Sequence, residues 1–372
     1  MYLLLLSTLY QIKSFAIILC CDIIITMSTY FYERNLKANQ KIKEMQKQLP
    51  DCCNDFLLGI ENSSSALSRL GYCYDMQTFF TYLSNEISKF EGKKVKDFTY
   101  QDINRVTDVD LEHYLSYLNS FQGKDGRMYA NSEKTKARKF ACIRAMFKFF
   151  FKKNKIDSNV TEKVNPPKLH EKEIIRLEVD EVANLLDSVE SGNKLTKQQL
   201  CFHEHTKTRD MAILTLFLGT GIRISELVGL DIGDIDISQN AFTITRKGGN
   251  RVILYFGEEV KQALIDYMKE RTTNEFVEKD EKALFLSMRN KRINVRTVEL
   301  LVKKYSKLVT PLKHITPHKL RSTYGTNLYK ETGDIYVVAD VLGHKDVNTT
   351  KKYYAAITDD IRKNAATKVK LR

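Results

Sequence analysis

Between residues 35 and 156 the apolar positions recur at the spacing of α-helices. In MQTFFTYLSNEI (76–87) an apolar stripe begins at Phe79 and Phe80 and continues through Tyr82 and Leu83. VDLEHYLSYLNSF repeats the pattern, and KARKFACIRAMFKFFFKK combines a basic face with an aromatic one. We expect about four or five helices here, joined by loops such as QGKDGRM, with the apolar stripes packed in a core. The basic faces would suit phosphate groups if nucleic acid is the partner.

The periodicity stops at VNPPKLHEKE (164–173), which contains two consecutive prolines. Proline removes a backbone donor and fixes φ, so this stretch cannot continue a helix and marks a domain boundary. Beyond it, EVDEVANLLDSVES predicts a new helix, and TRDMAILTLFLGTG predicts an apolar helix that ends at Gly219 and Gly221.

AFTITRKGGNRVILYF (241–256) reads as a β-hairpin, because two β-rich runs flank a glycine-containing turn at 247–250. Helical patterns dominate again after the hairpin. The fold class expected for the whole chain is therefore mainly α, with a helical N-terminal domain and an α-rich second domain that holds a small antiparallel β-sheet.

The first 26 residues are apolar, but Lys13 and Asp22 interrupt the run. A membrane span needs about 20 apolar residues with few charges, and a signal peptide should begin with positive charge. The apolar run ends near Met27, where MSTYFYERNL begins with a second methionine. We prefer translation from Met27, with a membrane-associated leader as the alternative.

The formal net charge of the chain is +13, which favours polyanionic partners: nucleic acid first, an anionic membrane surface second. The seven cysteines show no C-x-x-C spacing, so the pattern indicates neither a zinc ribbon nor a disulfide scaffold and fits a reducing cytoplasm. The HEH triplet at 203–205 lacks accompanying ligands, so a solvated loop is the simpler interpretation than a metal site.

Arg223 follows a glycine turn in GTGIRISELVGL and opens a short helix, with Glu226 one turn later. An arginine beside a helix start can offer a fork of donors to a phosphate. The plain alternative is an ion pair between Arg223 and Glu226 within the helix.

Two further stretches carry cationic or proton-transfer groups. Lys247 lies at the tip of the hairpin, where a lysine is usually solvated. In ITPHKLRSTYGTNLY, Pro317 suits the first turn of a helix, and His318 and Arg321 would share one face of it.

The stretch LGHKDVNTTKKYY (342–354) places His344 nine residues before Tyr353. In helical phase Tyr354 aligns with Val347, an apolar position, whereas Tyr353 aligns with Asp346, a polar one. Tyr354 therefore reads as a core residue and Tyr353 as the one placed for chemistry.

Arginines, histidines, a lysine and one suitable tyrosine together indicate phosphoryl transfer through a covalent intermediate. The chain has no G-x-x-x-x-G-K-[ST] motif for ATP and no carboxylate cluster suited to two magnesium ions. No cofactor, metal or small-molecule substrate is expected.

These motifs, in this order and spacing, resemble the tyrosine recombinase (phage integrase) family, including Xer-type recombinases, from residue 35 to 361. The resemblance implies a helical, SAM-like core-binding domain and a DNA breaking-rejoining catalytic domain that close around double-stranded DNA. The resemblance implies that Arg223 and Arg321 hold the scissile phosphate and that Glu226 orients the site. Lys247 would protonate the leaving 5′ oxygen, and His318 would assist proton transfer. His344 would hydrogen-bond the phosphate, and Tyr353 would attack it to form a 3′-phosphotyrosyl link.

The domains implied are a leader at 1–26, a core-binding domain at 35–160, a linker at 161–173, a catalytic domain at 174–357 and a tail at 358–372 that would dock on a neighbouring protomer. Many relatives have a histidine two residues after the nucleophile, whereas this chain has Ala355. The segment SVESGNKLTKQQLCFHEHTK (188–207) is longer than in compact relatives, and we expect a loop there. The family also implies a homo-tetramer on paired sites, or a hetero-partner recombinase, for DNA integration, excision or resolution. The alternative to an enzyme of DNA recombination is a non-catalytic DNA-binding protein of the same fold.

Overall fold

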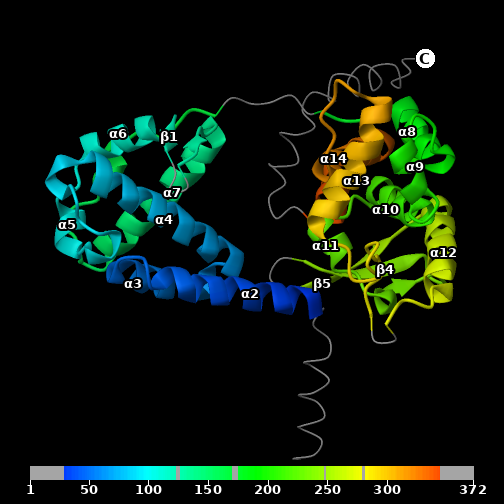
Figure 1. The fold of residues 1–372 in the computed structure, drawn as a ribbon, viewed down its shortest axis with the longest axis horizontal. Helices are drawn as coiled ribbons and strands as arrows, with labels where there is room; N and C mark the ends of the chain where they lie inside the picture. The colour runs from blue at the N-terminus through cyan, green and yellow to red at the C-terminus, as the bar shows by residue number, and fades with distance from the viewer. Residues whose placement is uncertain (1–28, 123–125, 170–174, 247–248, 279–280, 344–372) are drawn as a thin grey trace, which may run out of the picture. The chain divides into compact units, whose positions relative to one another are not determined.

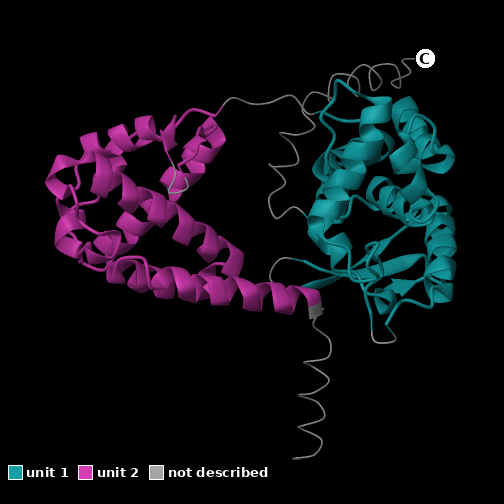
Figure 2. Ribbon diagram, viewed as in Figure 1, with its two compact units in different colours: residues 1–28, 173–372 teal, residues 29–172 magenta. Residues whose placement is uncertain are grey.

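The computed structural model describes residues 29–122, 126–169, 175–246, 249–278 and 281–343 (Figure 1). These residues form two compact units, whose boundary falls between Lys172 and Glu173 (Figure 2). The N-terminal unit therefore comprises 29–169 of the described chain, and the C-terminal unit comprises the described residues from 175 on. The expected leader at 1–26 and the tail at 358–372 lie outside the described residues.

The N-terminal unit is a helical bundle with one minimal hairpin. Its elements are α2 (Thr29–Gln46), α3 (Asp51–Gly59), α4 (Ala66–Glu86), α5 (Tyr100–Asn104), α6 (Asp108–Tyr117), β1 (Phe121–Gln122), β2 (Met128–Tyr129) and α7 (Glu133–Lys152), with short 3-10 turns between several of them. Six α-helices in the described part of this unit exceed the predicted four or five. The predicted loop QGKDGRM also proved wrong in part, because β1 and β2 pair as antiparallel strands at its two ends.

The core of this unit is aromatic. α4 packs against α2 and α7, and Phe79, Phe80, Phe140, Phe147 and Phe150 are all buried. The predicted apolar stripe is confirmed, since Tyr82 and Leu83 are buried as well. Ser65 and Ser132 accept hydrogen bonds from the first turns of α4 and α7, which fixes where these long helices begin.

The C-terminal unit surrounds one apolar helix with other helices and a three-stranded sheet. Its elements are α8 (Val179–Ser191), α9 (Lys197–His203), α10 (Lys207–Thr220), α11 (Ile224–Val228), β3 (Ile235–Asp236), β4 (Ala241–Thr245), β5 (Arg251–Tyr255), α12 (Glu258–Thr273), α13 (Val295–Val309), α14 (Pro317–Thr332) and α15 (Ile335–Leu342). α10 packs against α8, α12 and α14. It ends at Thr220, with Gly221 in the left-handed conformation (φ 62°), so Gly219 is a helical residue rather than an end.

The predicted hairpin is confirmed. β4 and β5 pair antiparallel, with Thr243 opposite Ile253, and β3 adds a third strand on the other side of β4. The predicted loop at 188–207 is wrong, because α9 forms within it. Thr196 and Gln199 build a reciprocal cap at the start of α9, a pattern that stabilises even a short helix.

The chain entering the C-terminal unit is anchored on α14. The backbone N–H of Leu177 donates to Thr323 Oγ1 at 3.0 Å, and Thr323 is buried. Close by, Lys313 Nζ lies 2.6 Å from Glu181 of α8.

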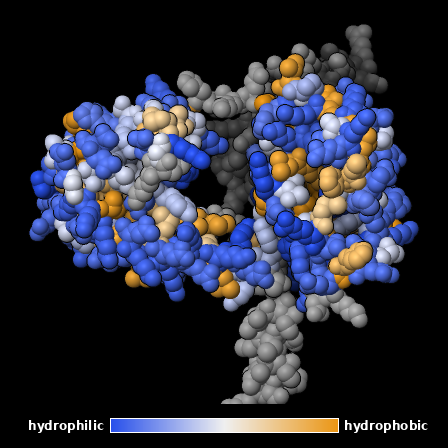
Figure 3. Space-filling view, viewed as in Figure 1, coloured by the Kyte–Doolittle hydropathy of each residue, from blue (hydrophilic) through white to orange (hydrophobic). Residues whose placement is uncertain are grey.

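The fold class is as predicted, mainly helical with small antiparallel sheets. None of the helices described is both long and apolar enough to cross a bilayer. Figure 3 shows hydrophilic residues over most of the visible face of each unit.

Candidate active site

Arg223 sits at the boundary between a turn and a helix, as the sequence predicted. It is the N-cap of α11, and its backbone N–H donates to Glu226 Oε2 at 2.9 Å. Its guanidinium Nη1 donates to Glu226 Oε1, also at 2.9 Å. Glu226 is buried, whereas about a third of the Arg223 side chain is exposed. The ion pair between Arg223 and Glu226 is therefore present. It holds the guanidinium in place and leaves part of it accessible to solvent.

Arg321 reaches the same place from α14. Pro317 is the first residue of this helix, as predicted, and Arg321 follows one turn later. Arg321 is 5% exposed and donates through Nη1 to the carbonyl of Gly221 and through Nη2 to the carbonyl of Leu342. Gly221 directly precedes Ile222 and Arg223, so these bonds bring the two arginines together.

Both arginines meet at the C-terminal end of α15. Arg223 Nη2 donates to the carbonyls of Leu342 at 3.1 Å and Gly343 at 3.0 Å, and Arg321 shares the Leu342 carbonyl. The last carbonyls of a helix have no partner within the helix and carry partial negative charge. They therefore attract guanidinium groups without neutralising them, because a carbonyl has no net charge.

A third arginine, Arg246, was not among the predicted site residues. It follows the end of β4 and donates through Nη2 to the carbonyl of Val341 at 2.9 Å. Burial lowers its pKa, Glu226 acts in the opposite direction, and Arg223 lowers it further. Sequence alone gave no signal for Arg246, since an arginine at a hairpin end is usually solvated and its partner lies 95 residues away.

His318 lies on the exposed surface of α14, one turn before Arg321. Lys247, His344, Tyr353 and Tyr354 lie outside the described residues, so their roles stay predictions. Arg246 and Gly343 directly precede Lys247 and His344 in the chain.

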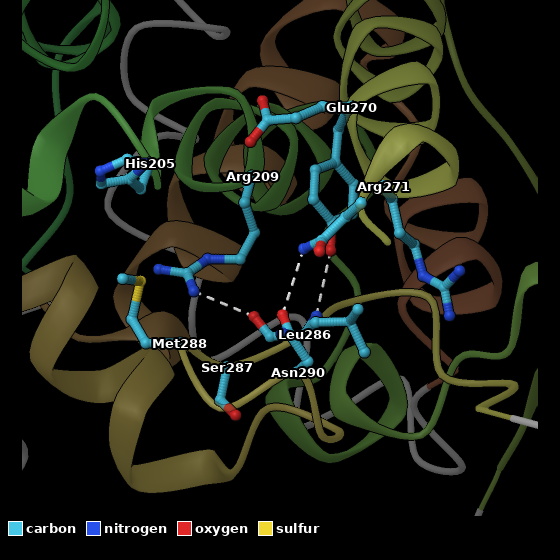
Figure 4. Close-up of a pocket in the computed structure, with 10 residues that line it drawn as sticks. His205, Arg209, Glu270, Arg271, Leu286, Ser287, Met288 and Asn290 are labelled. Atoms are coloured by element: carbon cyan, nitrogen blue, oxygen red, sulfur yellow. Dashed lines mark hydrogen bonds between the residues drawn. The ribbon is translucent and has the colours of Figure 1, made fainter. Parts of the chain in front are cut away.

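A pocket of about 330 Å³ lies elsewhere in the same unit, between α10, α12 and the turn around Ser287. Figure 4 shows Arg209 beside it, donating to the carbonyl of Leu286 at 2.9 Å. Arg209 also donates to the buried Asp210 at 2.7 Å. This arginine is engaged by a carboxylate of its own unit, and neither Arg223 nor Arg321 lines the pocket.

Asp210 is the centre of a buried polar cluster. Besides Arg209, it accepts hydrogen bonds from Lys304 Nζ at 3.1 Å and Tyr305 Oη at 3.0 Å. His203 Nδ1 lies 3.2 Å from the Tyr305 hydroxyl. We call Asp210 with Arg209, His203, Lys304 and Tyr305 the Asp210 cluster.

The solvated-loop interpretation of His203 is therefore wrong. The side chain is 2% exposed and packs beneath Gly192, and its hydrogen bond to Tyr305 makes it part of the core. Among the described residues no three or more His, Cys, Asp or Glu side chains are arranged to hold a metal ion.

Comparison with known proteins shows the family to which the chain belongs. The model of the phage integrase family matches residues 176–360. A tyrosine recombinase XerC from Caldanaerobacter subterraneus subsp. tengcongensis is 35% identical over 292 residues, which cover 76% of each chain. A tyrosine recombinase XerS from Streptococcus uberis is 29% identical over 81% of this chain and 93% of its own. The chain therefore belongs to the phage integrase family, whose members are site-specific tyrosine recombinases.

The fold agrees as well. A solved structure of the XerH site-specific recombinase, bound to palindromic difH substrate in a post-cleavage complex, superposes with a TM-score of 0.61. It covers 81% of this chain and 80% of its own at 17% identity, so it shows the likeness of fold alone. The resemblance predicted from the motifs is confirmed.

Proposed function

We propose that this protein cuts and rejoins double-stranded DNA at specific sites through a 3′-phosphotyrosyl intermediate. Tyr353 Oη would attack the scissile phosphorus, forming a Tyr–O–P bond and breaking the bond from phosphorus to the 5′ oxygen. Lys247 would supply the proton that the leaving 5′ oxygen takes up. The convergence of Arg223 and Arg321 on the Leu342 carbonyl is the observation that carries the proposal.

The two arginines would stabilise the charge on the phosphate as it approaches the transition state. They are already held in place by buried partners, Glu226 for Arg223 and the Gly221 carbonyl for Arg321. Donors that are oriented in advance stabilise a developing charge without reorganisation, which is usually the largest contribution to catalysis. Glu226 thus orients Arg223 rather than contacting the phosphate itself.

A phenol with a pKa near 10 is a weak nucleophile at neutral pH, so the site must help it. His318, exposed on α14 within a turn of Arg321, would assist proton transfer, and His344 would hydrogen-bond the phosphate. Because the phosphotyrosyl link conserves the energy of the broken bond, rejoining needs neither ATP nor a metal.

The N-terminal unit would act as the core-binding domain and the C-terminal unit as the catalytic domain, closing on DNA. The net charge of +13 and the DNA-bound XerH relative support this assignment. The affinity for DNA should fall by roughly 0.9 log unit per phosphate contact for each tenfold rise in salt. A shallow slope would count against a clamp.

We further propose that four protomers act on two paired sites, either as a homo-tetramer or with a partner recombinase, and that the tail at 358–372 docks on a neighbouring protomer. The biological use would be integration or excision of a mobile element, or Xer-like resolution. The reaction takes place in the cytoplasm on this proposal.

Covalent trapping tests the proposal. The full-length protein is mixed with nicked duplexes from DNA flanking its own gene, denatured, and resolved for a protein–DNA adduct. An adduct lost in Tyr353→Phe but kept in Tyr354→Phe is the expected result. Loss only in Tyr354→Phe would place the nucleophile one residue later. DNA that shifts in a native gel without any adduct would favour the non-catalytic DNA-binding alternative.

A further inference from the structure

Arg246 bridges the β-hairpin and α15. Its backbone closes the hairpin: its N–H donates to the carbonyl of Asn250 at 2.8 Å, and its carbonyl accepts from Gly249 at 3.0 Å. Its side chain leaves the hairpin and donates to Val341 at 2.9 Å and to the Asp340 carbonyl at 3.4 Å. One residue thus fastens the end of a strand to the last turn of a distant helix.

The contact depends on the absence of a side chain at Gly343. This residue ends α15 in the left-handed conformation, with φ of 61°. A Cβ there would lie 2.3 Å from Arg246 Nη1 and 2.4 Å from Cζ. The guanidinium therefore lies directly against the Gly343 backbone, and Gly343 serves both the turn and the contact.

The donors of Arg246 point into the protein rather than into solvent. Both Nη groups are on carbonyls of α15, and Nε is buried without a hydrogen-bond partner. These carbonyls thus occupy a donor on each Nη group of Arg246. Arg246 is therefore suited to hold parts of the protein together, whereas Arg223 keeps about a third of its side chain exposed.

We propose that Arg246 is a positioning residue that fastens the end of β4 to the last turn of α15 and so determines where the neighbouring general acid acts. The inference rests on the proposed function, in which Lys247 protonates the leaving oxygen. Lys247 follows Arg246 directly, and the α15 carbonyls that Arg246 binds adjoin those bound by Arg223 and Arg321. Arg246 thus links the arginine pair to the end of β4, directly before Lys247 in the sequence.

The test compares two leaving groups. One nicked duplex has the natural 5′ oxygen at the scissile phosphate, and the other has a bridging 5′ sulfur. A thiolate leaves without being protonated, so sulfur removes the need for a general acid. Single-turnover rates of adduct formation are measured on both substrates for the wild type, Arg246→Ala and the reference variant Lys247→Ala.

We expect Arg246→Ala to react about tenfold or more slowly on the oxygen substrate and within about threefold of the wild-type rate on sulfur. Lys247→Ala should lose about a hundredfold or more on oxygen, the contribution typical of a general acid, and also recover on sulfur. Arg251→Ala is the matched control: it removes one charge from the same hairpin, its side chain is half exposed, and its acidic partner is Asp234. Its ratio of sulfur to oxygen rates should equal that of the wild type.

Two further variants provide the same test should Arg246→Ala fold poorly. Arg246→Lys removes the forked guanidinium, and Gly343→Ala displaces the guanidinium of Arg246. An equal loss of rate on both substrates would overturn the inference, and so would an unchanged rate on oxygen. Weaker DNA binding with a smaller salt dependence would overturn it in favour of a direct phosphate contact. Absence of any adduct with wild-type protein on either substrate would overturn the proposed function itself.

Discussion

The C-terminal unit contains two groups of cationic side chains, each with one buried arginine, that differ in what they bind. In the Asp210 cluster, Arg209 and Lys304 both contact one carboxylate that is 1% exposed. At the end of α15, Arg223, Arg246 and Arg321 all donate to main-chain carbonyls. The first arrangement neutralises charge inside the protein. The second orients guanidinium groups on uncharged carbonyls, with Glu226 as the carboxylate partner of Arg223, and on the proposed function Arg223 and Arg321 present this charge to a phosphate. Arginine burial alone therefore does not mark the active site.

The largest contrast is expected between two arginines of similar burial, Arg321 at 5% and Arg209 at 8% exposed. Arg321→Ala should slow single-turnover adduct formation by about a thousandfold, because a preorganised cation at the phosphate is lost. Arg209→Ala should lower the melting temperature while the rate per folded molecule stays within about threefold of wild type. Arg321→Lys, which keeps the charge but loses the fork, should also be slow. A comparable loss of rate in folded Arg209→Ala would contradict the different roles assigned to Arg209 and Arg321.

Asp210→Asn tests the neutralising role of the carboxylate. Removing one partner of a buried ion pair leaves the cations uncompensated, so the free energy of unfolding should fall by about 3 kcal/mol. Urea denaturation measures this change. Glu226→Gln, which alters the carboxylate partner of Arg223, should instead slow adduct formation more than it lowers the free energy of unfolding. Slower cleavage by Asp210→Asn with unchanged stability would contradict this assignment.

Gly192→Ala should destabilise the Asp210 cluster by about 1–2 kcal/mol. Gly192 has a φ of 68°, and a Cβ there would lie 2.9 Å from His203 Nε2. Gly333→Ala is the matched control, because Gly333 has a φ of 66° but open space around its Cβ position. The difference between the two unfolding free energies isolates the steric term. Equal losses would mean that the ring of His203 moves aside at no cost.

The smallest effect expected is a pH dependence of stability from His203. Burial, followed by the positive charge of Lys304, lowers its pKa below the ordinary 6.5. The folded state then binds the proton less readily than the unfolded state, so this contribution is fully present above about pH 6.5 and is lost as pH falls through the folded pKa. Melting temperatures of wild type and His203→Gln between pH 7.5 and 5.5 measure it. The wild type should lose more stability on acidification, and parallel curves would refute the assignment.

The site was predictable where its signals are local. Pro317 and the helical spacing placed Arg321 on α14, and the turn before Arg223 with Glu226 one turn later indicated the start of α11. The contacts of Arg246 and His203 were not predicted, because their partners, Val341 and Tyr305, lie 95 and 102 residues away. Hydrogen bonds over such separations leave no periodic trace, and polar residues in polar surroundings suggest solvent rather than burial.

The fold was predictable at the level of its strongest patterns. The apolar stripe of α4, the apolar helix α10 and the β4–β5 hairpin all follow from periodicity or turn chemistry. α9 was not predicted, because its seven residues carry too few apolar positions to reveal a helical period. Thr196 and Gln199 nevertheless have the spacing of a capping box. Lys247, His344 and Tyr353 remain predictions from motif and helical phase.

The hydrogen bond from Leu177 to Thr323 has a mechanical consequence. Leu177 lies near the start of the described part of the C-terminal unit, and Thr323 is two residues from Arg321 on the same helix. Lys313 donates to Glu181 of α8 and also to the carbonyl of Arg176, at 3.3 Å. A pull on the chain before Leu177 would thus be shared between α14, the helix that carries Arg321, and Lys313, which lies outside that helix.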